Sequence, residues 1–377
     1  MSAWSIAFWS ALAFTGYTYM GYPLLVWALC RLRRPIGVSA GEPAQWPEVT
    51  VVIAVHNERE RALRKVVNLR ELDYPADKLH IVFACDGCTD GTEAALAQLP
   101  GVRIVSYQAR QGKPYALNQA MKEVTTPIVV FADVRQRVSP QAVRALVERL
   151  SQEGVGAVSG ELVHLDPITH AASHIGLYWR YEKWIRGCES RLASTVGVTG
   201  ALYAIRREHY TPLASDTLLD DVVQPMHIVR KGLRVQLESQ ALIYDELQQD
   251  IAGERKRKIR TLTGNFQAFA RFPWMLLPWR NPVWFQFLSH KVFRLLVPYA
   301  LAVLLVASLF AQGWIYKAVF AMQFGFYGAA FCGARSAHLR KLRLVSFATV
   351  FTELNWAAVL GLGNFLRGRL DARWERT

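Results

Sequence analysis

Two apolar regions at the ends of the chain flank a middle of mixed character. Residues 5–30 run almost without charge, which exceeds the about 20 residues that a helix needs to cross a membrane. Arg31, Arg33 and Arg34 follow directly, and positive charge marks the cytoplasmic side of a span. The pattern predicts a transmembrane anchor over residues 1–30. A cleaved signal peptide is disfavoured, because no charged segment precedes the apolar run.

Three more apolar stretches, residues 293–311, 314–332 and 344–366, predict a C-terminal transmembrane region over residues 291–366. Three crossings would place the basic tail, residues 367–377, on the side opposite to the one that positive charge prefers. The third stretch contains Glu353 and Asn355, so it either crosses, re-enters or lies in the interface. The sequence leaves these alternatives open.

Residues 251–290 combine aromatic and basic side chains and are broken by Pro273, Pro278 and Pro282. Such a segment is typical of short helices that lie along a membrane surface. Arginine interleaved with aromatic rings also suits nucleic-acid stacking. Because the segment abuts the predicted spans, membrane lipids are the favoured acidic partner, and we expect no nucleic acid.

The middle of the chain alternates between strand and helix patterns after a linker over residues 31–48. Residues 49–55 form an apolar, β-branched run that is typical of a buried parallel strand. Further strands are predicted at 79–84, 102–107, 128–132 and 155–159, and helices at 59–72, 92–99, 115–124, 139–150 and 222–229. We expect Ser139 and Pro140 to cap and begin the 139–150 helix. The alternation predicts an α/β domain with a mostly parallel sheet.

Composition agrees with a soluble domain held at a membrane. The 377 residues carry a net charge of +14, and 52% are hydrophobic, above the about 45–50% of soluble domains. The apolar excess sits at the two ends, and the middle that remains is long enough to form a packed core. Disordered and fibrous chains are therefore excluded. Five cysteines without a dense block suit free thiols in a reducing compartment.

Polar residues follow three of the predicted strands at the ends where parallel sheets bind ligands. His56, Asn57 and Glu58 follow the first strand, Asp86 the second and Asp133 the fourth. A single such aspartate could simply cap a helix, but polar residues at three strand ends favour one shared site.

No P-loop or dinucleotide fingerprint occurs in the sequence. Cys85 and Cys88 form one CxxC with no second pair, so a metal or redox role is disfavoured. Arg110 and Lys113 flank Gly112 before a predicted helix, a pattern that favours a phosphate-bearing ligand over a solvated turn.

The segments VTVVIAVHNE (49–58), CDGCTDGT (85–92), RQGKPYALN (110–118) and FADVRQ (131–136) occur in that order. Together they resemble membrane-bound family-2 glycosyltransferases, the group of cellulose, chitin and hyaluronan synthases. The resemblance covers about residues 49–267. It implies a GT-A-like (Rossmann-like) sheet flanked by helices, in a cytoplasmic glycosyltransferase domain over residues 49–250.

The resemblance also implies residue roles. His56, Asn57, Glu58 and Asp86 would line the nucleotide pocket, Lys113 would lie near the base or phosphates, and Asp133 would hold the ribose and a divalent cation, Mg²⁺ or Mn²⁺. Gly200, in the segment TGALY (199–203), matches a small-residue loop at the acceptor sugar. In the segment TLLDD (217–221), Asp221 would be the catalytic base beside Asp220, although both would also complement the dipole of the helix that follows.

Two departures from the family pattern stand out. Arg135 replaces the second Asp of the DxD element, which weakens the expected metal dependence. Its guanidinium could neutralise part of the diphosphate, or it could point into solvent or a salt bridge. Of the QxxRW element only Arg260 remains, close to Arg257, and Thr261 replaces the Trp, so processive synthesis is in doubt. The basic run could otherwise be a membrane-surface patch.

The resemblance implies inverting transfer from a nucleotide-diphosphate sugar, with UDP favoured, to a lipid-linked or polysaccharide acceptor. Asp221 would act as the base, and Arg260 and Lys113 would stabilise the leaving diphosphate. We expect an integral protein of the bacterial inner membrane. The alternative is a non-catalytic or regulatory membrane subunit of glycosyltransferase descent, suggested by the lost motif residues.

Overall fold

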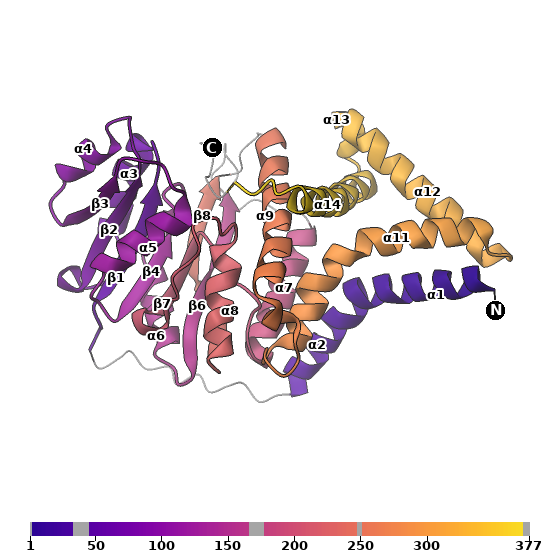
Figure 1. Cartoon of the computed structure of the whole chain (residues 1–377), viewed down its shortest axis with the longest axis horizontal. Coiled ribbons are helices and arrows are strands. Elements are labelled where there is room, and N and C mark those ends of the chain that lie inside the picture. Colours follow the sequence, from indigo (N-terminus) through magenta and orange to yellow (C-terminus); the bar gives the residue numbers. More distant parts are fainter. Residues whose placement is uncertain (1, 33–44, 166–176, 247–250, 372–377) are drawn as a thin grey trace. The chain divides into compact units, whose positions relative to one another are not determined.

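The computed structural model describes residues 2–32, 45–165, 177–246 and 251–371, which fall into two compact units (Figure 1). The sheet unit comprises residues 26–251, 268–284 and 370–377, and the helical unit comprises residues 1–25, 252–267 and 285–369. Most of the predicted linker (residues 33–44) and of the basic tail (residues 372–377) lies outside the described residues.

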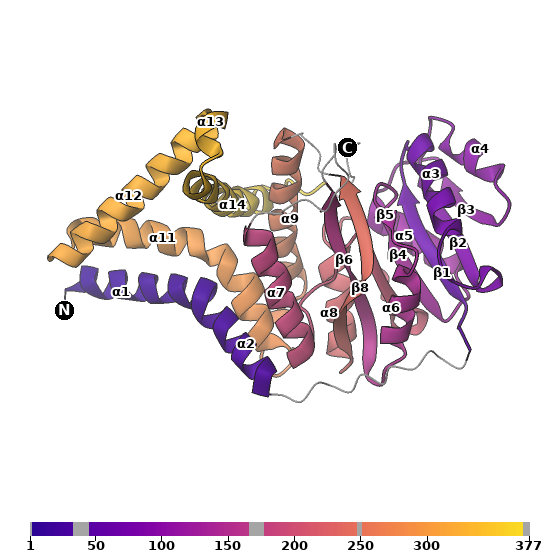
Figure 2. The same ribbon diagram turned by 180° about the vertical axis from the view of Figure 1, so that it is seen from behind.

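The sheet unit is built on an eight-stranded sheet with the order β3-β2-β1-β4-β7-β6-β8-β5, seen from its two sides in Figures 1 and 2. The strands are β1 (Val49–Val55), β2 (Leu79–Asp86), β3 (Val102–Tyr107), β4 (Ile128–Ala132), β5 (Arg137–Val138), β6 (Val155–Leu165), β7 (Leu202–Arg206) and β8 (Arg234–Glu246). The five predicted strands correspond to β1, β2, β3, β4 and β6.

The first four strands of this order pair in parallel, as the sequence predicted. β1 is apolar apart from one threonine and buried at six of its seven positions, because helices cover both faces of a parallel sheet. Ile128, Val130 and Ala132 of β4 join the large core on one face of the sheet. Phe131 points to the opposite face, where its ring stacks on Tyr203.

The sheet is mixed rather than uniformly parallel, because β7 enters it antiparallel between β4 and β6. β6 and β8 pair in parallel, and β5 pairs antiparallel with the end of β8. β7 includes the last two residues of the predicted small-residue loop. Leu202 and Tyr203 are therefore buried strand residues and not loop residues.

Five predicted helices are present in the sheet unit, with shifted ends. They are α3 (Arg59–Arg70), α4 (Thr92–Ala97), α5 (Lys113–Glu123), α6 (Ala142–Leu150) and α8 (Asp220–Arg230). The helix α7 (Leu177–Leu192) was not predicted. The predicted start of α6 at Ser139 and Pro140 was wrong. The backbone N–H of Ser139 bonds instead to Leu242 of β8, which keeps this residue in the strand region.

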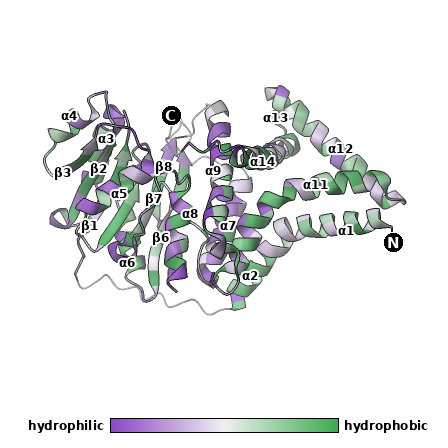
Figure 3. Ribbon diagram, viewed as in Figure 1, coloured by the Kyte–Doolittle hydropathy of each residue, from purple (hydrophilic) through white to green (hydrophobic). Residues whose placement is uncertain are grey.

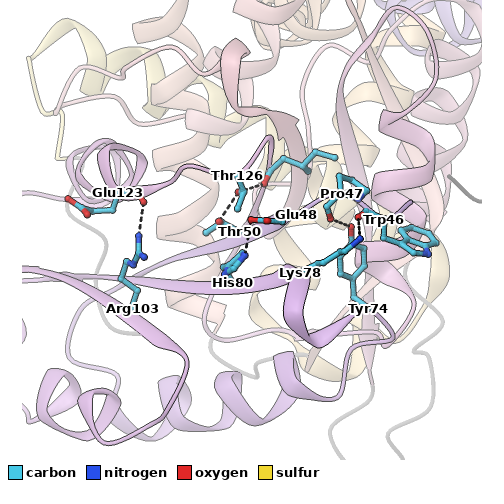
Figure 4. Close-up of polar contacts among 11 residues, drawn as sticks. Trp46, Pro47, Glu48, Thr50, Tyr74, Lys78, His80, Arg103, Glu123 and Thr126 are labelled. Carbon is cyan, nitrogen blue, oxygen red and sulfur yellow. Dashed lines mark hydrogen bonds and ion pairs between the residues drawn. The ribbon is translucent and has the colours of Figure 1, made fainter. Parts of the chain in front are cut away.

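Polar contacts join the beginnings of β1 and β2 to their surroundings at the edge opposite the strand ends discussed above (Figure 4). Thr50 and Thr126 share a buried hydrogen bond of 2.8 Å between hydroxyl groups. Lys78 donates to the carbonyl of Trp46, and Tyr74 donates to the carbonyl of Pro47. These bonds fix where β1 starts, and therefore which residues emerge at its far end.

The remaining helices lie wholly or partly in the helical unit. They are α1 (Ala3–Gly16), which continues through a π-helical turn (Tyr17–Gly21) into α2 (Tyr22–Leu32), α9 (Ile251–Arg271), α10 (Trp284–Gln286), α11 (Phe293–Phe310), α12 (Trp314–Arg335), α13 (Ala337–Arg340) and α14 (Arg343–Leu366). α1 packs along α11 through Phe8 and Ala11 against Leu304 and Ala307. The short helices predicted for residues 251–290 were partly wrong, because α9 is one unbroken helix as far as Arg271.

Two helical segments of the described chain, Trp284–Phe310 and Arg343–Leu366, are long and apolar enough to cross a membrane. Figure 3 shows α11 largely in the hydrophobic colour. Large apolar side chains remain exposed on α11 and α12, including Val303, Leu309, Met322 and Phe324. The N-terminal helix and α12, both predicted as spans, are helical but are not among these two segments.

We expect Gly160→Ala in β6 to lower stability by about 1–3 kcal/mol through overpacking. A Cβ at Gly160 would lie 2.8 Å from the carbonyl oxygen of Ala241 and 2.8 Å from a methyl group of Leu202. Gly187→Ala in α7 is the matched control, because nothing lies within 4 Å of its Cβ position. Unfolding midpoints in denaturant provide the measurement, and equal midpoints for the two variants would contradict this packing.

Candidate active site

The strand ends singled out by the sequence meet at one edge of the sheet unit. Val55 of β1 pairs with Cys85 of β2, and Val52 pairs with Phe131 of β4, so the residues that follow these strands emerge together. Nδ1 of His56 lies 2.6 Å from the carbonyl oxygen of Asp86, which joins the first two strand ends directly. The predicted edge therefore exists as a cluster of polar groups.

Asp86 organises the turn before α5. Its side chain is fully buried, and its two carboxylate oxygens accept the backbone N–H groups of Gln111 (2.6 Å) and Gly112 (2.9 Å). A buried carboxylate needs such partners. The turn is thereby held so that α5 begins at Lys113 and its ammonium group points back toward the strand ends.

The residues after β1 are tied to their neighbours. Asn57 adopts a left-handed backbone conformation (φ 54°), and its side-chain oxygen accepts the N–H of Thr89 at 2.6 Å. Glu58 pairs with Arg61 one turn into α3 at 2.9 Å. These contacts connect the end of β1 to the turn after β2.

Lys113 connects two carboxylates that are distant in sequence. Its Nζ lies 3.0 Å from Oδ1 of Asp133 and 3.4 Å from Oδ2 of Asp220. Burial alone would lower the pKa of Lys113, but the nearby Asp133 and Asp220 carboxylates outweigh it and raise that pKa above its ordinary value. The ammonium group is therefore firmly charged.

Asp220 and Asp221 occupy the first turn of α8, where negative charge complements the helix dipole. Asp220 is buried against Lys113, whereas Asp221 is half-buried. The Cβ position of Gly200 lies 3.3 Å from Oδ2 of Asp221, so this glycine leaves the carboxylate room. The two neighbours thus have different surroundings: one is paired with an ammonium, and the other faces the turn before β7.

Arg135 forms its ion pair outside the cluster of Lys113, Asp133 and Asp220. Its guanidinium donates to Asp245 of β8 at 2.6 Å, and Gln136 donates to the same carboxylate at 3.3 Å. Asp245 is 7% exposed, so its charge needs this partner. Of the two expectations for Arg135, the structure therefore favours the salt bridge.

Arg257 and Arg260 lie on the part of α9 that belongs to the helical unit. The predicted roles of these two arginines remain predictions, because both residues belong to a different unit from the cluster around Lys113.

Sequence reasoning missed several residues that adjoin the cluster. Arg186 of α7 donates to Ser159 (3.0 Å) and Thr199 (3.2 Å) beneath the turn that carries Gly200. Lys65 of α3 is 2% exposed, although it is a lysine. One signal was available for Lys65: it interrupts the apolar face of a helix. No local signal identifies Arg186.

A divalent cation fits this site only if a ligand helps to hold it. Within the described residues, no group of three or more His, Cys, Asp or Glu side chains could hold a metal ion. Asp133 is 38% exposed at its side chain and offers one carboxylate. Mg²⁺ is commonly bound by one or two carboxylates together with substrate phosphates, so the donor set suits a cation shared with a diphosphate.

Comparison with known proteins identifies relatives of this arrangement. Residues 50–210 match the protein family described as Glycosyl transferase family 2. The chain is 22% identical over 235 residues to poly-beta-1,6-N-acetyl-D-glucosamine synthase of Staphylococcus aureus, a match that covers 59% of this chain and 56% of that protein. It is 28% identical over 162 residues to beta-monoglucosyldiacylglycerol synthase of Synechocystis sp., covering 41% of this chain and 34% of that protein.

The chain thus spans little more than half the length of the first of these relatives. A solved structure is similar over nearly its whole length. Mannosyltransferase PcManGT from Pyrobaculum calidifontis, in complex with GDP-Man and Mn²⁺, gives a TM-score of 0.71 at 25% identity and covers 95% of this chain and 98% of that chain. The match confirms the GT-A-like sheet flanked by helices.

We expect Lys113→Met to lower stability by about 3 kcal/mol, because Asp220 is left buried without its cation. Lys122→Met, on the same helix, is the control, since that lysine is exposed and donates to the side chain of Gln119. Combining Lys113→Met with Asp220→Asn should recover part of the loss. Unfolding in denaturant measures all three variants, and equal stability of the two lysine variants would refute the pairing.

Proposed function

Because residues 50–210 form a glycosyl transferase family 2 domain, we propose that this chain transfers a sugar from a nucleoside-diphosphate sugar to a hydroxyl group, with inversion at the anomeric carbon. The observation that carries the proposal is the Lys113 cluster. The firmly charged ammonium of Lys113 lies beside Asp133 and Asp220. Asp221 is the residue that follows Asp220. A diphosphate needs such a cation, and an acceptor hydroxyl needs a base beside it.

Asp221 is the proposed base. It removes the proton from the acceptor hydroxyl while that oxygen attacks the anomeric carbon from the side opposite the diphosphate. Its partial exposure and the space left by Gly200 support this assignment. Asp220 is less suited, because it is buried and paired with Lys113.

The donor is proposed to lie along the strand ends. His56, Asn57 and Glu58 line the nucleotide pocket, and Asp86 shapes it by holding the turn before Lys113. Lys113 stabilises the departing diphosphate. A bound Mg²⁺ or Mn²⁺, held by Asp133 and the diphosphate, would neutralise further negative charge.

The acceptor and the nucleotide are open to direct test. The relatives are named as synthases of a polysaccharide and of a glycolipid, so we propose a lipid-linked or saccharide acceptor. The sequence resemblance favours UDP, whereas the similar structure holds GDP-Man. Purified protein should therefore be offered both UDP and GDP sugars, with product identification by mass spectrometry.

Membrane association is part of the proposal. The two candidate spans and the exposed apolar side chains of the helical unit support an integral membrane protein. We propose that the sheet unit faces the cytoplasm, because Arg31, Arg33 and Arg34 follow the N-terminal apolar run. The alternative of a regulatory subunit would be supported if the protein bound nucleotide sugars but transferred none.

We expect Asp221→Asn to abolish transfer while leaving donor affinity within a few fold. A general base acts in the transition state and contributes about 10²–10⁴-fold to the rate, but little to donor binding. Asp220→Asn is the matched variant one residue away and should retain more turnover. Transfer rates and calorimetric donor affinities measure both.

The opposite ranking would assign the base differently. If Asp220→Asn were inactive and Asp221→Asn kept turnover, Asp220 would be the base. Loss of donor binding in Asp221→Asn would show that Asp221 contributes to donor binding rather than to the transition state.

We expect EDTA to stop transfer and Mn²⁺ to restore it. Asp133 is the one carboxylate proposed to bind the cation, and the guanidinium of Arg135 already donates to Asp245. The double variant Arg135→Gln with Asp245→Asn removes both charges of this pair and should leave the metal response unchanged. Activity that survives EDTA in the unaltered protein but not in the double variant would show that Arg135 neutralises the diphosphate.

A further inference from the structure

A β-turn that contains Gly200 lies against the proposed base. The N–H of Leu202 bonds to the carbonyl of Thr199 at 2.9 Å, which closes this Gly200 turn at the start of β7. The Cβ position of Gly200 lies 3.3 Å from Oδ2 of Asp221. The N–H of Val198, directly before the turn, donates to the carbonyl of Asp221 at 2.9 Å. The beginning of the turn therefore lies against both the backbone and the side chain of Asp221.

The two ends of the Gly200 turn are held in different ways. Its last residue, Leu202, belongs to β7 and pairs with the last residue of β4. The carbonyl of Ala201 accepts the N–H of Asp133 at 3.1 Å, which extends that pairing by one bond. The first residue, Thr199, precedes β7 and lies outside the strand ladder. The sheet thus fixes the end near Asp133, whereas the end near Asp221 depends on bonds from side chains.

Arg186 of α7 forms a hydrogen-bond network with the first residue of the turn. Its Nη1 donates to the hydroxyl of Thr199 at 3.2 Å, and its Nη2 donates to the hydroxyl of Ser159 at 3.0 Å. The hydroxyl of Ser159 also accepts the backbone N–H of Thr199 at 2.8 Å. Ser159 is fully buried in β6, which gives the network an anchor in the sheet. Arg186 and Ser159 together hold Thr199 by its side chain and by its backbone.

A guanidinium suits this network because it carries only donors and presents them in a planar fork. The hydroxyl oxygen of Ser159 offers one lone pair to Arg186 and the other to the N–H of Thr199, while its own hydrogen points to the carbonyl of Gly160 at 2.9 Å. An ammonium is a point charge on a flexible stem, so a lysine would hold the two hydroxyls in a less defined geometry. A methionine would leave both hydroxyls without this donor.

We infer that Arg186 is a positioning residue, which sets the place of the Asp221 carboxylate through the Gly200 turn. It acts through Thr199 and Val198, and this role requires no contact with either substrate. A general base must lie within hydrogen-bond reach of the acceptor hydroxyl, and a displacement of about 1 Å can lower the rate by about 10²-fold. The inference rests on the proposed function, because it takes Asp221 as the base.

The test compares Arg186→Met with Lys183→Met in the full-length, detergent-solubilised protein. Lys183 is the matched control, because it lies one turn earlier on α7 and pairs with Glu161 of the same strand, β6, at 2.7 Å. We expect Arg186→Met to lower kcat by about tenfold, with donor affinity within about twofold. Lys183→Met should keep both values.

The probes for these measurements are defined compounds. The donors are UDP-N-acetylglucosamine, UDP-glucose and GDP-mannose with Mn²⁺, and calorimetry gives their affinities. The acceptors are vesicles that contain diacylglycerol and, separately, N-acetylglucosamine oligosaccharides. Transfer rates at saturating donor and increasing acceptor concentration then give kcat and the acceptor KM.

Two further variants make the test specific to the network. Arg186→Lys keeps the charge but not the fork, so its kcat should fall between those of Arg186→Met and the unaltered protein. Thr199→Val removes the hydroxyl that Arg186 bonds and keeps the backbone N–H, so it should lower kcat by itself. Combined with Arg186→Met it should add little, because residues in one network are coupled. If Arg186→Met does not fold, Thr199→Val decides the question, since an unaltered kcat would then contradict the inference.

Three other outcomes would overturn the inference. Equal kcat in Arg186→Met and Lys183→Met would show that the turn holds Asp221 without the guanidinium. A raised acceptor KM at unchanged kcat would show that Arg186 binds the acceptor directly. Full additivity of Arg186→Met and Thr199→Val would show that the two residues act separately.

Failure of the proposed function gives a different result. If the unaltered protein transferred no sugar from any of the donors, both proposals would fall. If it transferred sugar while Arg186→Met kept the unaltered kcat, the proposed function would stand and only the role of Arg186 would be wrong.

Discussion

The ammonium group of Lys113 is the point at which separate parts of the sheet unit meet. It lies 3.0 Å from Asp133, which follows β4, and 3.4 Å from Asp220, which begins α8. Without this cation two carboxylates would face each other, one of them buried, at a cost that a marginally stable fold tolerates poorly. Asp86 fixes the turn that delivers Lys113. The site therefore depends on a chain of contacts that starts at the end of β2 and closes at the start of α8.

Several charged side chains near the candidate site are buried at a cost in free energy. Lys65, Arg186 and Asp245 are charged side chains held inside or at the margin of the core, and each contacts a segment that carries a proposed site residue. Apolar residues at such positions would avoid the free-energy cost of desolvating a charge. Buried charges are more common at functional sites than elsewhere in a protein. In this protein they lie under the two segments that present Asp133 and Gly200.

The largest differences between expectation and structure concern the second half of the sheet. Local pattern predicted the parallel strands correctly, because an uninterrupted apolar run such as β1 suits a strand covered on both faces. β7 was not predicted as a strand, because its first residues were assigned to a small-residue loop. β8 was not predicted either, because its thirteen residues mix exposed and buried positions. The start of α6 was misplaced because Ser139 bonds to β8, a partner that local capping rules do not contain.

The sequence by itself determined the strand ends that carry His56, Asp86 and Asp133, and parallel pairing then required them to share an edge. It also determined the apolar helices, because length and hydropathy are local properties. Only the tertiary structure decided which charges meet. Arg135 and Asp245 are 110 residues apart and pair because β8 returns beside β5 and β6. Lys65 meets Gln136 because α3 packs against β5. Such contacts follow from the order of strands in the sheet, which no local pattern encodes.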